Sequence, residues 1–386
     1  MVRGSFYQRL SGFYFCYFAF IGAFAPYFAL YLKSLDYSAA EIGLLLAVSP
    51  VARIFGPNLW GWLSDHYRAR GRLIRLTAVG TAVVFTTVFF NHGFGWMFAA
   101  MVLLNLFWCG VLPLAESATL SLVGSRVGAY GRVRVWGSVG FVAVVIAGGY
   151  GLDYFGIGAL APLALVLLAL MATSTFFLPR DREPSHHVEH ASILSIVTRP
   201  EVMALMAGFF LMQVAHGPYN AFYSIHLVEA GYTKKTVGWL WSVGVISEIG
   251  LFMLLPRLMR AYTLNQILLF SFGCAFVRLL MIAWGVGSLT ILLAAQLLHA
   301  ITFGAFHAAG VAMMHQIFRG RNQARGQAIY TSLGYGLGGT LGTLMAGYSW
   351  ETLGSEWTFT FAATAALLAL VVVAWKPVSL PVRPAS

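Results

Sequence analysis

The stretch GWLSDHYRARGR, residues 61–72, is a charged connection between two apolar runs, near 41–63 and 73–91. Each run has the length that an α-helix needs to cross a membrane, about 20 residues. Because arginines are costly in hydrocarbon, the charged stretch is expected to turn the chain at a membrane face. The same alternation continues in both directions along the chain. It predicts twelve spans, near 11–33, 41–63, 73–91, 95–121, 133–151, 158–178, 203–228, 236–256, 263–284, 288–315, 325–348 and 355–375.

The composition agrees with an all-α membrane protein. Of the 386 residues, 59% are hydrophobic and only 10% are charged, whereas soluble domains carry about 25% charged residues. This excludes a soluble enzyme, a disordered chain and a disulfide scaffold. Cys16, Cys109 and Cys274 lie in apolar runs without CxxC or metal-ligand spacing. The sequence therefore predicts neither a cofactor nor a metal site.

The distribution of Lys and Arg predicts the orientation in the membrane. Of 24 such residues, 19 fall on the side of the N-terminus and only 3, namely Lys33, Lys234 and Lys235, on the other. The positive-inside rule then places both termini in the cytoplasm. We expect the membrane to be the cytoplasmic (inner) membrane of a bacterium. The net charge of +11 is spread over many connections, so it indicates topology and a lipid bilayer rather than a nucleic-acid partner.

The longest polar connection, residues 179–202, lies almost at the middle of the chain. It predicts an N-terminal six-helix bundle over 1–178, a cytoplasmic linker over 179–202, and a C-terminal six-helix bundle over 203–386 with a short cytoplasmic tail.

The two halves also show weak internal similarity. At an offset of 195 residues Gly43 falls on Gly238, and Arg53 falls on Glu248, so equivalent positions carry opposite charges. Two six-helix repeats predict alternating access to a site near the bilayer midplane.

A few ionisable side chains lie in or at the edge of the predicted spans. Because each costs about 3 kcal/mol or more in a bilayer unless paired or hydrated, each marks a candidate site. They are Arg53, Glu116, Arg134, His216, Glu248, Arg278, His299 and His307. A purely structural role remains the alternative to a transport role. Glu116 with Arg134, and Glu248 with Arg278, could form ion pairs that hold two helices together. Each histidine could donate a hydrogen bond to a neighbouring helix.

The sum of these charges favours an anionic ligand. Three arginines against two glutamates leave a surplus of +1 when the histidines are neutral. A guanidinium without a partner can bind a carboxylate through two parallel hydrogen bonds. Protonation of either glutamate would raise the surplus to +2, which gives a physical route to coupled symport of H⁺ and an anion.

Residues 61–72 resemble the G-x-L-S-D signature of the major facilitator superfamily. The resemblance implies a gate at the cytoplasmic face, in which Asp65 pairs with Arg70, Arg72 and a helix N-terminus. It also implies two pseudo-symmetric bundles of six helices and, by the default of the superfamily, a monomer.

Further stretches resemble the lactose permease branch, among them Pro113-Leu-Ala-Glu116 and Gly131-Arg-Val-Arg134. This resemblance implies that Glu116 and Arg134 are a substrate pair. It also matches Glu248, Arg278 and His299 to that branch's Glu of span 8, Arg of span 9 and His of span 10.

Several positions depart from that branch. Thr302 stands where lactose permease has its acidic proton carrier, Gln296 stands where it has a lysine, and Phe141 replaces its sugar-stacking tryptophan. Arg53 is an additional cation. This pattern resembles the phenylpropionate permease family, whose members are described as 3-phenylpropionic acid transporters.

The sequence thus predicts a proton-coupled symporter that imports a small organic anion, an aromatic carboxylate such as 3-phenylpropionate. Arg53 would bind the carboxylate, and Phe141 with neighbouring aromatic residues would bind the ring. The alternatives are a sugar or nucleoside symporter and a drug exporter. A membrane enzyme is disfavoured, because no HExxH, GxSxG or Walker motif occurs. The predicted substrate site is Arg53, Glu116, Arg134, Phe141, Tyr27, His216 and Asn220, and the predicted proton-coupling group is Glu248, Arg278, His299 and His307, with Glu248 or His299 as the carrier.

Overall fold

The computed structural model describes residues 4–123, 127–178 and 193–378, and within these ranges every regular element is a helix. Eleven of the described helices are long and apolar enough to cross a membrane. Each of the twelve predicted spans falls on helical structure, which confirms the all-α membrane class. The N-terminal elements are α1 (Gly4–Ser34), α2 (Ala39–Tyr67), α3 (Arg70–Phe85), η1 (Thr86–Phe89), α4 (Phe94–Val123), α5 (Val127–Phe155), η2 (Ile157–Ala159) and α6 (Leu160–Phe176).

The C-terminal elements include two π-helical segments inside predicted spans. The span near 288–315 divides into α11, η3 and α12, and the span near 325–348 divides into α13, η5 and α14. The elements are α7 (Leu194–Val197), α8 (Pro200–Glu229), α9 (Lys234–Ala261), α10 (Leu264–Gly285), α11 (Leu289–His299), η3 (Ala300–Ala305), α12 (Phe306–Ile317), η4 (Gly320–Asn322), α13 (Gln323–Ile329), η5 (Tyr330–Gly338), α14 (Gly339–Leu353) and α15 (Ser355–Trp375).

The chain divides into two compact units. Unit 1 comprises Met1–His186 and Asn220–Ser242, and unit 2 comprises His187–Tyr219 and Val243–Ser386. The hairpin between α8 and α9 therefore groups with the N-terminal helices. Most of the predicted linker lies outside the described residues, and the predicted bundle limits at 178 and 203 stay a prediction.

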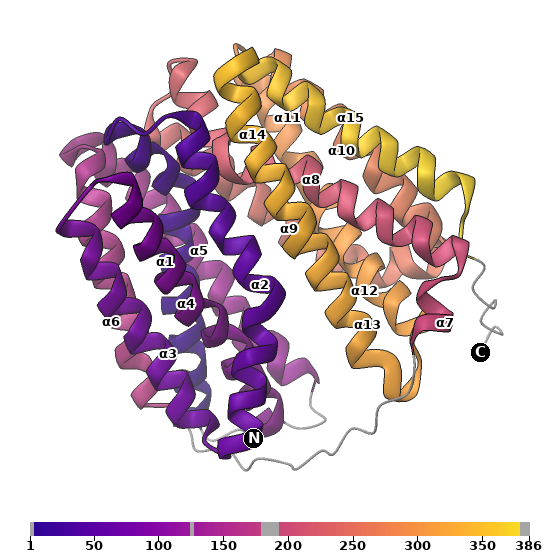
Figure 1. The fold of residues 1–386 in the computed structure, drawn as a ribbon, viewed down its shortest axis with the longest axis horizontal. Coiled ribbons are helices and arrows are strands. Elements are labelled where there is room, and N and C mark those ends of the chain that lie inside the picture. The colour runs from indigo at the N-terminus through magenta and orange to yellow at the C-terminus, as the bar shows by residue number, and fades with distance from the viewer. Residues whose placement is uncertain (1–3, 124–126, 179–192, 379–386) are drawn as a thin grey trace. The chain divides into compact units, whose positions relative to one another are not determined.

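In unit 1, α1 packs against α5 and α6, while α4 packs against α2 and α3 (Figure 1). Glycine allows the close approach of α1 to α5. A Cβ added at Gly22 would lie 2.6 Å from the backbone oxygen of Phe141. Small residues at such crossings let two membrane helices pack backbone to backbone.

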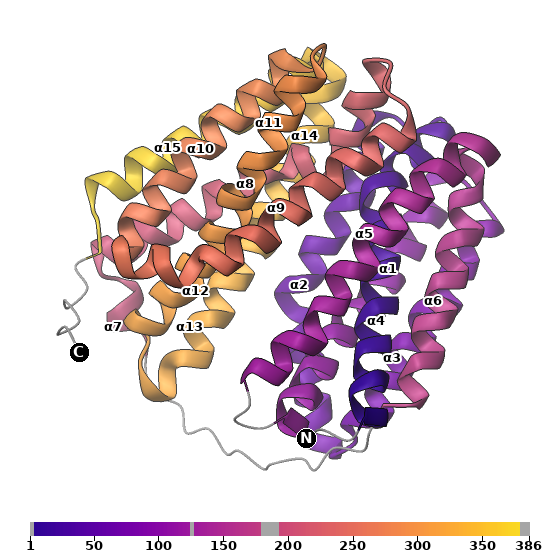
Figure 2. The ribbon, with the colours of Figure 1, turned by 180° about the vertical axis from the view of Figure 1, so that it is seen from behind.

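In unit 2, α10 packs against α11, α12 and α15 (Figure 2). A second close crossing joins α8 to α14, because a Cβ at Gly217 would lie 2.6 Å from the Cα of Gly342. Gly217 is 195 residues after Gly22. The helices that begin the two halves thus use a glycine at equivalent positions for the same kind of contact, as expected for two pseudo-symmetric bundles.

The ends of α2 are set by local chemistry. Ser38 caps its N-terminus, and Glu41 returns a hydrogen bond to the Ser38 backbone, which forms a capping box. Arg68 ends the helix with a φ of 47°, in the left-handed region. The charged stretch around Asp65 therefore lies on the last turns of α2 and the start of α3.

Candidate functional site

Glu116 of α4 and Arg134 of α5 form an ion pair in unit 1. The Nε of Arg134 lies 3.4 Å from the Oε1 of Glu116, and each side chain is 32% exposed. Tyr130 donates its hydroxyl to the same carboxylate oxygen at 3.3 Å, and the Arg134 guanidinium lies 4.0 Å from the centre of the Phe18 ring. The structure therefore brings the predicted pair together, while its part in transport stays a prediction.

Arg53 lies in the interior of α2 and its side chain is exposed. Within the described residues it forms neither a hydrogen bond nor an ion pair. It lies close enough to Tyr17 and Cys109 for its charge to act on the hydroxyl and the thiol. A guanidinium at this depth is stable only beside water or a counter-charge, so it can receive an anion.

Tyr17 of α1 belongs to the same cluster as Arg53, Glu116 and Arg134, and sequence reasoning did not identify it. Tyr17 is only 4% exposed, and the charges of Arg53, Glu116 and Arg134 all act on its hydroxyl. Its ring stacks on Trp108 of α4, with 4.4 Å between centroids and 4° between planes. One sequence pattern could have indicated this pair, because Trp108 lies two turns before Glu116 on α4. On α1, Tyr17 is one of many aromatic residues and does not stand out.

Three other predicted substrate residues have different surroundings. Phe141 is 8% exposed and packs beside Gly22. Tyr27 is fully buried, and its hydroxyl lies within hydrogen-bond distance of the backbone oxygens of Val145, at 2.6 Å, and Lys234, at 3.3 Å. Asn220 is exposed. Phe141 thus packs against α1 and Tyr27 hydrogen-bonds to backbone oxygens, and a role for any of the three in substrate binding stays a prediction.

Arg278 of α10 is the centre of a second cluster, in unit 2. The residue is fully buried. Its Nε donates to the backbone oxygen of Ala295 at 3.0 Å, and its Nη1 donates to the Oγ1 of Thr302 at 3.4 Å. Its guanidinium also lies 4.1 Å from the centre of the Tyr219 ring, a cation–π contact. Thr302 stands on η3 where the lactose permease branch has an acid, and here it accepts from the arginine.

Tyr219 of α8 joins the remaining members of that cluster. Its hydroxyl donates to the Oε1 of Gln296 at 3.0 Å, and its ring lies 5.5 Å from that of His299. The charge of Glu248 on α9 acts on the same hydroxyl. Glu248 also lies beside η3, because a Cβ at Gly304 would be 3.0 Å from its Cγ. Three of the four predicted proton-coupling residues thus surround Tyr219, which sequence reasoning did not single out.

The two other histidines have separate contacts. His216 is 3% exposed, with its Nδ1 2.8 Å from the backbone oxygen of Met212. The charge of Arg278 acts on it, so it belongs to the unit 2 cluster. His307 of α12 is exposed, and its Nδ1 lies 2.9 Å from the hydroxyl of Tyr335 and 3.3 Å from that of Tyr330.

The predicted gate residues lie at the α2–α3 connection. Asp65 and Arg72 are exposed. Arg70 is only 7% exposed, and its Nη1 donates to the Oγ of Ser121 on α4 at 3.4 Å. Arg70 therefore attaches the start of α3 to the end of α4, and its pairing with Asp65 stays a prediction.

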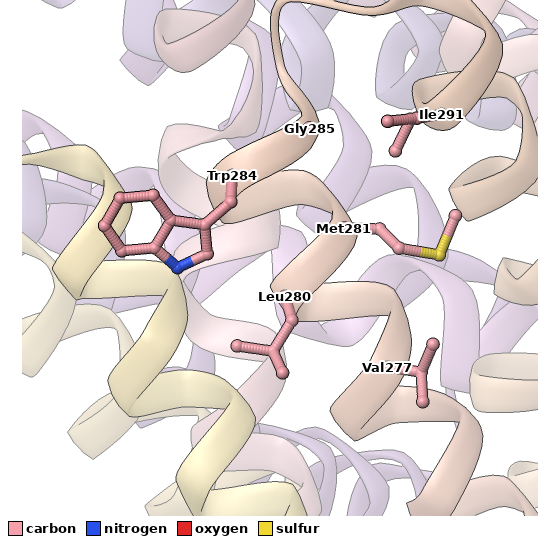
Figure 3. Close-up of a pocket in the computed structure, with 6 residues that line it drawn as sticks. All are labelled: Val277, Leu280, Met281, Trp284, Gly285 and Ile291. Atoms are coloured by element: carbon pink, nitrogen blue, oxygen red, sulfur yellow. The ribbon is translucent and has the colours of Figure 1, made fainter.

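Within residues 4–123, 127–178 and 193–378 no group of three or more His, Cys, Asp or Glu side chains could hold a metal ion. A pocket on α10 and α11 is lined only by Gly285 and apolar side chains (Figure 3), namely Val277, Leu280, Met281, Trp284 and Ile291. No predicted site residue lines it.

The sequence profile of the MFS_1 like family matches residues 7–361. The match covers most of the chain, and the chain belongs to this family. It is therefore a multi-pass membrane transporter of the major facilitator type, with a small-molecule substrate, and not an enzyme.

The chain is similar to two named relatives and to one solved structure. The probable 3-phenylpropionic acid transporter of Escherichia coli (strain K12) is 31% identical over 88% of this chain and 90% of the relative. The maltose permease of Geobacillus stearothermophilus is 28% identical over 88% and 86%, respectively. A mutant of the nucleoside transporter NupG has the same fold, with a TM-score of 0.85 at 16% identity over 96% of this chain and 99% of that one.

Proposed function

We propose that this protein is a proton-coupled symporter that imports a small organic anion, an aromatic carboxylate such as 3-phenylpropionate. Both termini would face the cytoplasm of a bacterium. The observation that carries the proposal is Arg53, a guanidinium in the interior of a membrane helix with no hydrogen bond or ion pair among the described residues. A carboxylate matches the planar fork of a guanidinium and supplies the missing counter-charge.

The named substrate of a relative supports the same class. The Escherichia coli relative at 31% identity is described as a probable 3-phenylpropionic acid transporter. Its substrate combines one carboxylate with one apolar ring. Arg53 supplies a cation for the carboxylate, and its charge acts on the hydroxyl of Tyr17, whose ring stacks on Trp108 and supplies aromatic surface.

The two ion clusters receive different roles in this proposal. Arg53 binds the substrate carboxylate, with Glu116 and Arg134 beside it as a pair that rearranges when substrate enters. Glu248 or His299 carries the proton in unit 2, where Arg278 and Tyr219 are their neighbours. Protonation of Glu248 removes a negative charge from the transport pathway, which favours binding of an anion. Substrate and proton would then be carried in the same direction.

Uptake into vesicles that contain the purified protein tests this proposal. Labelled 3-phenylpropionate, maltose and uridine are compared with and without an inward proton gradient, and empty vesicles correct for diffusion of the protonated acid. We expect gradient-dependent, saturable uptake of 3-phenylpropionate only. Uptake of this acid that ignores the gradient would remove proton coupling from the proposal.

A sugar or nucleoside symporter is the second candidate. The maltose permease at 28% identity favours a sugar, and the Glu116–Arg134 pair is the feature shared with the lactose permease branch. Saturable uptake of maltose or uridine, with none of 3-phenylpropionate, would establish this candidate and leave Arg53 with a structural role. Extrusion of a preloaded lipophilic cation would instead indicate a drug exporter.

A further inference from the structure

The Tyr17–Trp108 pair differs from its aromatic neighbours in unit 1. Tyr14 donates its hydroxyl to Thr119, and Tyr130 donates to Glu116. The hydroxyl of Tyr17 and the indole N–H of Trp108, by contrast, make no hydrogen bond within the described part of the chain. Two polar donors therefore remain available in a cluster where the nearby tyrosine hydroxyls already have partners.

The pair also presents a fixed aromatic surface. The Tyr17 ring covers one face of the Trp108 indole in parallel stacking, and Phe20 meets the indole edge-on at 4.9 Å. These contacts fix the plane of the indole, while Trp108 as a whole remains partly exposed. A planar ligand ring can stack on an indole face or meet its edge, as aromatic pairs in proteins do.

A third observation links this surface to the charge of Arg53. Arg53 acts electrostatically on the Tyr17 hydroxyl and on Cys109, the residue that follows Trp108. Gly56, one turn after Arg53 on α2, packs directly against Cys109. The guanidinium, the phenol donor and the indole thus come from α2, α1 and α4, and α2 contacts α4 one turn after Arg53 and one residue after Trp108.

We propose that Tyr17 and Trp108 determine the specificity of the transporter. The Tyr17 hydroxyl donates to the substrate carboxylate together with Arg53, and Trp108 recognises the aromatic ring. This inference rests on the proposed function and goes beyond it, because it selects planar aromatic acids over aliphatic acids of similar size. It also transfers ring recognition from Phe141, which packs against α1, to Trp108.

Equilibrium binding to the full chain in lipid nanodiscs tests the two roles separately. The probes are labelled 3-phenylpropionate, 3-cyclohexylpropionate and hexanoate, and the variants are Trp108→Leu, Trp108→Phe and Tyr17→Phe. Trp96→Leu is the matched control, because Trp96 is an exposed tryptophan of the same helix that donates to the backbone of Thr87.

Each variant has a distinct expected pattern. Trp108→Leu should raise the Kd for 3-phenylpropionate about 3- to 10-fold and change that for hexanoate by less than about 2-fold, since one aromatic contact is lost. Trp108→Phe should retain most of the preference. Tyr17→Phe should weaken all three acids by about 10-fold or more, because a hydrogen bond to a charged group is lost. The control should leave all three Kd values unchanged.

The wild-type protein provides a test that needs no variant to fold. It should bind 3-cyclohexylpropionate about 3- to 10-fold more weakly than 3-phenylpropionate, because a saturated ring has no π face. Equal affinity for these two acids, or equal weakening of all acids by Trp108→Leu, would overturn the specificity role alone. Failure of the wild type to bind any of the three acids would overturn the proposed function itself.

Discussion

The role that we expect for Arg53 follows from its position inside a membrane helix. On an exposed loop it would be a topology signal, like the other arginines of this chain. In the interior of α2, without an ion pair among the described residues, it needs either water or an anion. Glu116, by comparison, already has Arg134 and Tyr130 as partners, so it is the less available of the two charges.

Replacement of Arg53 tests whether it binds the carboxylate. Arg53→Gln should raise the KM for 3-phenylpropionate about 10- to 100-fold, the loss expected for a hydrogen-bonded charge. Arg53→Lys should restore part of it, since the charge returns without the planar fork. Initial uptake rates in vesicles measure both, with Arg257→Gln as an exposed arginine control. A normal KM in Arg53→Gln would assign Arg53 to structure or gating.

Glu248 is the side chain on which proton coupling is expected to depend. Glu248→Gln mimics a permanently protonated carrier, so it should abolish uptake driven by a pH gradient and preserve exchange of internal for external 3-phenylpropionate. Glu201→Gln, a substitution in the first turn of α8, should change neither. Uptake by Glu248→Gln that still follows the pH gradient would transfer the carrier role to His299.

The start of α9 depends on a carboxylate from a different helix. Both carboxylate oxygens of Asp153, near the end of α5, accept from backbone N–H groups of α9, from Lys234 at 2.9 Å and from Lys235 at 3.0 Å. The Nζ of Lys234 lies 3.7 Å from the same carboxylate. An acid at this position satisfies free N–H groups and complements the helix dipole. One side chain thus attaches the α8–α9 hairpin to α5.

Removal of this cap should lower stability by a predictable amount. Asp153→Ala should reduce the free energy of unfolding by about 1–2 kcal/mol, as for other helix caps, and Asp153→Asn by less. Lys33→Ala, which removes the exposed ion pair with Glu229, should cost about 1 kcal/mol or less. Thermal unfolding in detergent compares the three variants. An Asp153→Ala protein as stable as the wild type would show that the cap contributes little.

The orientation of the chain in the membrane is a prediction for the whole molecule. In a cysteine-free background, His92→Cys lies in the connection before α4 and should react with an impermeant thiol reagent added outside whole cells. Arg319→Cys lies between α12 and η4 and should react only after the membrane is made permeable. The reason is that Lys and Arg are enriched in cytoplasmic connections, which predicts that the segment containing Arg319 faces the cytoplasm. The opposite labelling pattern would reverse the orientation of the entire chain.

The spans were predictable because their signals are local. Length, apolarity and the charged stretch at 61–72 act over one helix at a time, so each predicted span falls on helical structure. The division of two spans by η3 and η5 was not predicted. A change from i→i−4 to i→i−5 hydrogen bonding is a small local adjustment that leaves the apolar pattern intact.

The same distinction applies to the site. Ionisable residues in apolar runs are conspicuous in a sequence, because their burial is costly, and this identified Arg53, Glu116, Arg134, Glu248 and Arg278 as candidates. Tyr17, Trp108 and Tyr219 carry no such signal, since aromatic residues are common throughout the chain. Their place beside the charged residues comes from contacts between helices that are distant in sequence. Class, spans and candidate charges therefore follow from the sequence, while the aromatic residues beside those charges follow from helix packing, which no local pattern encodes.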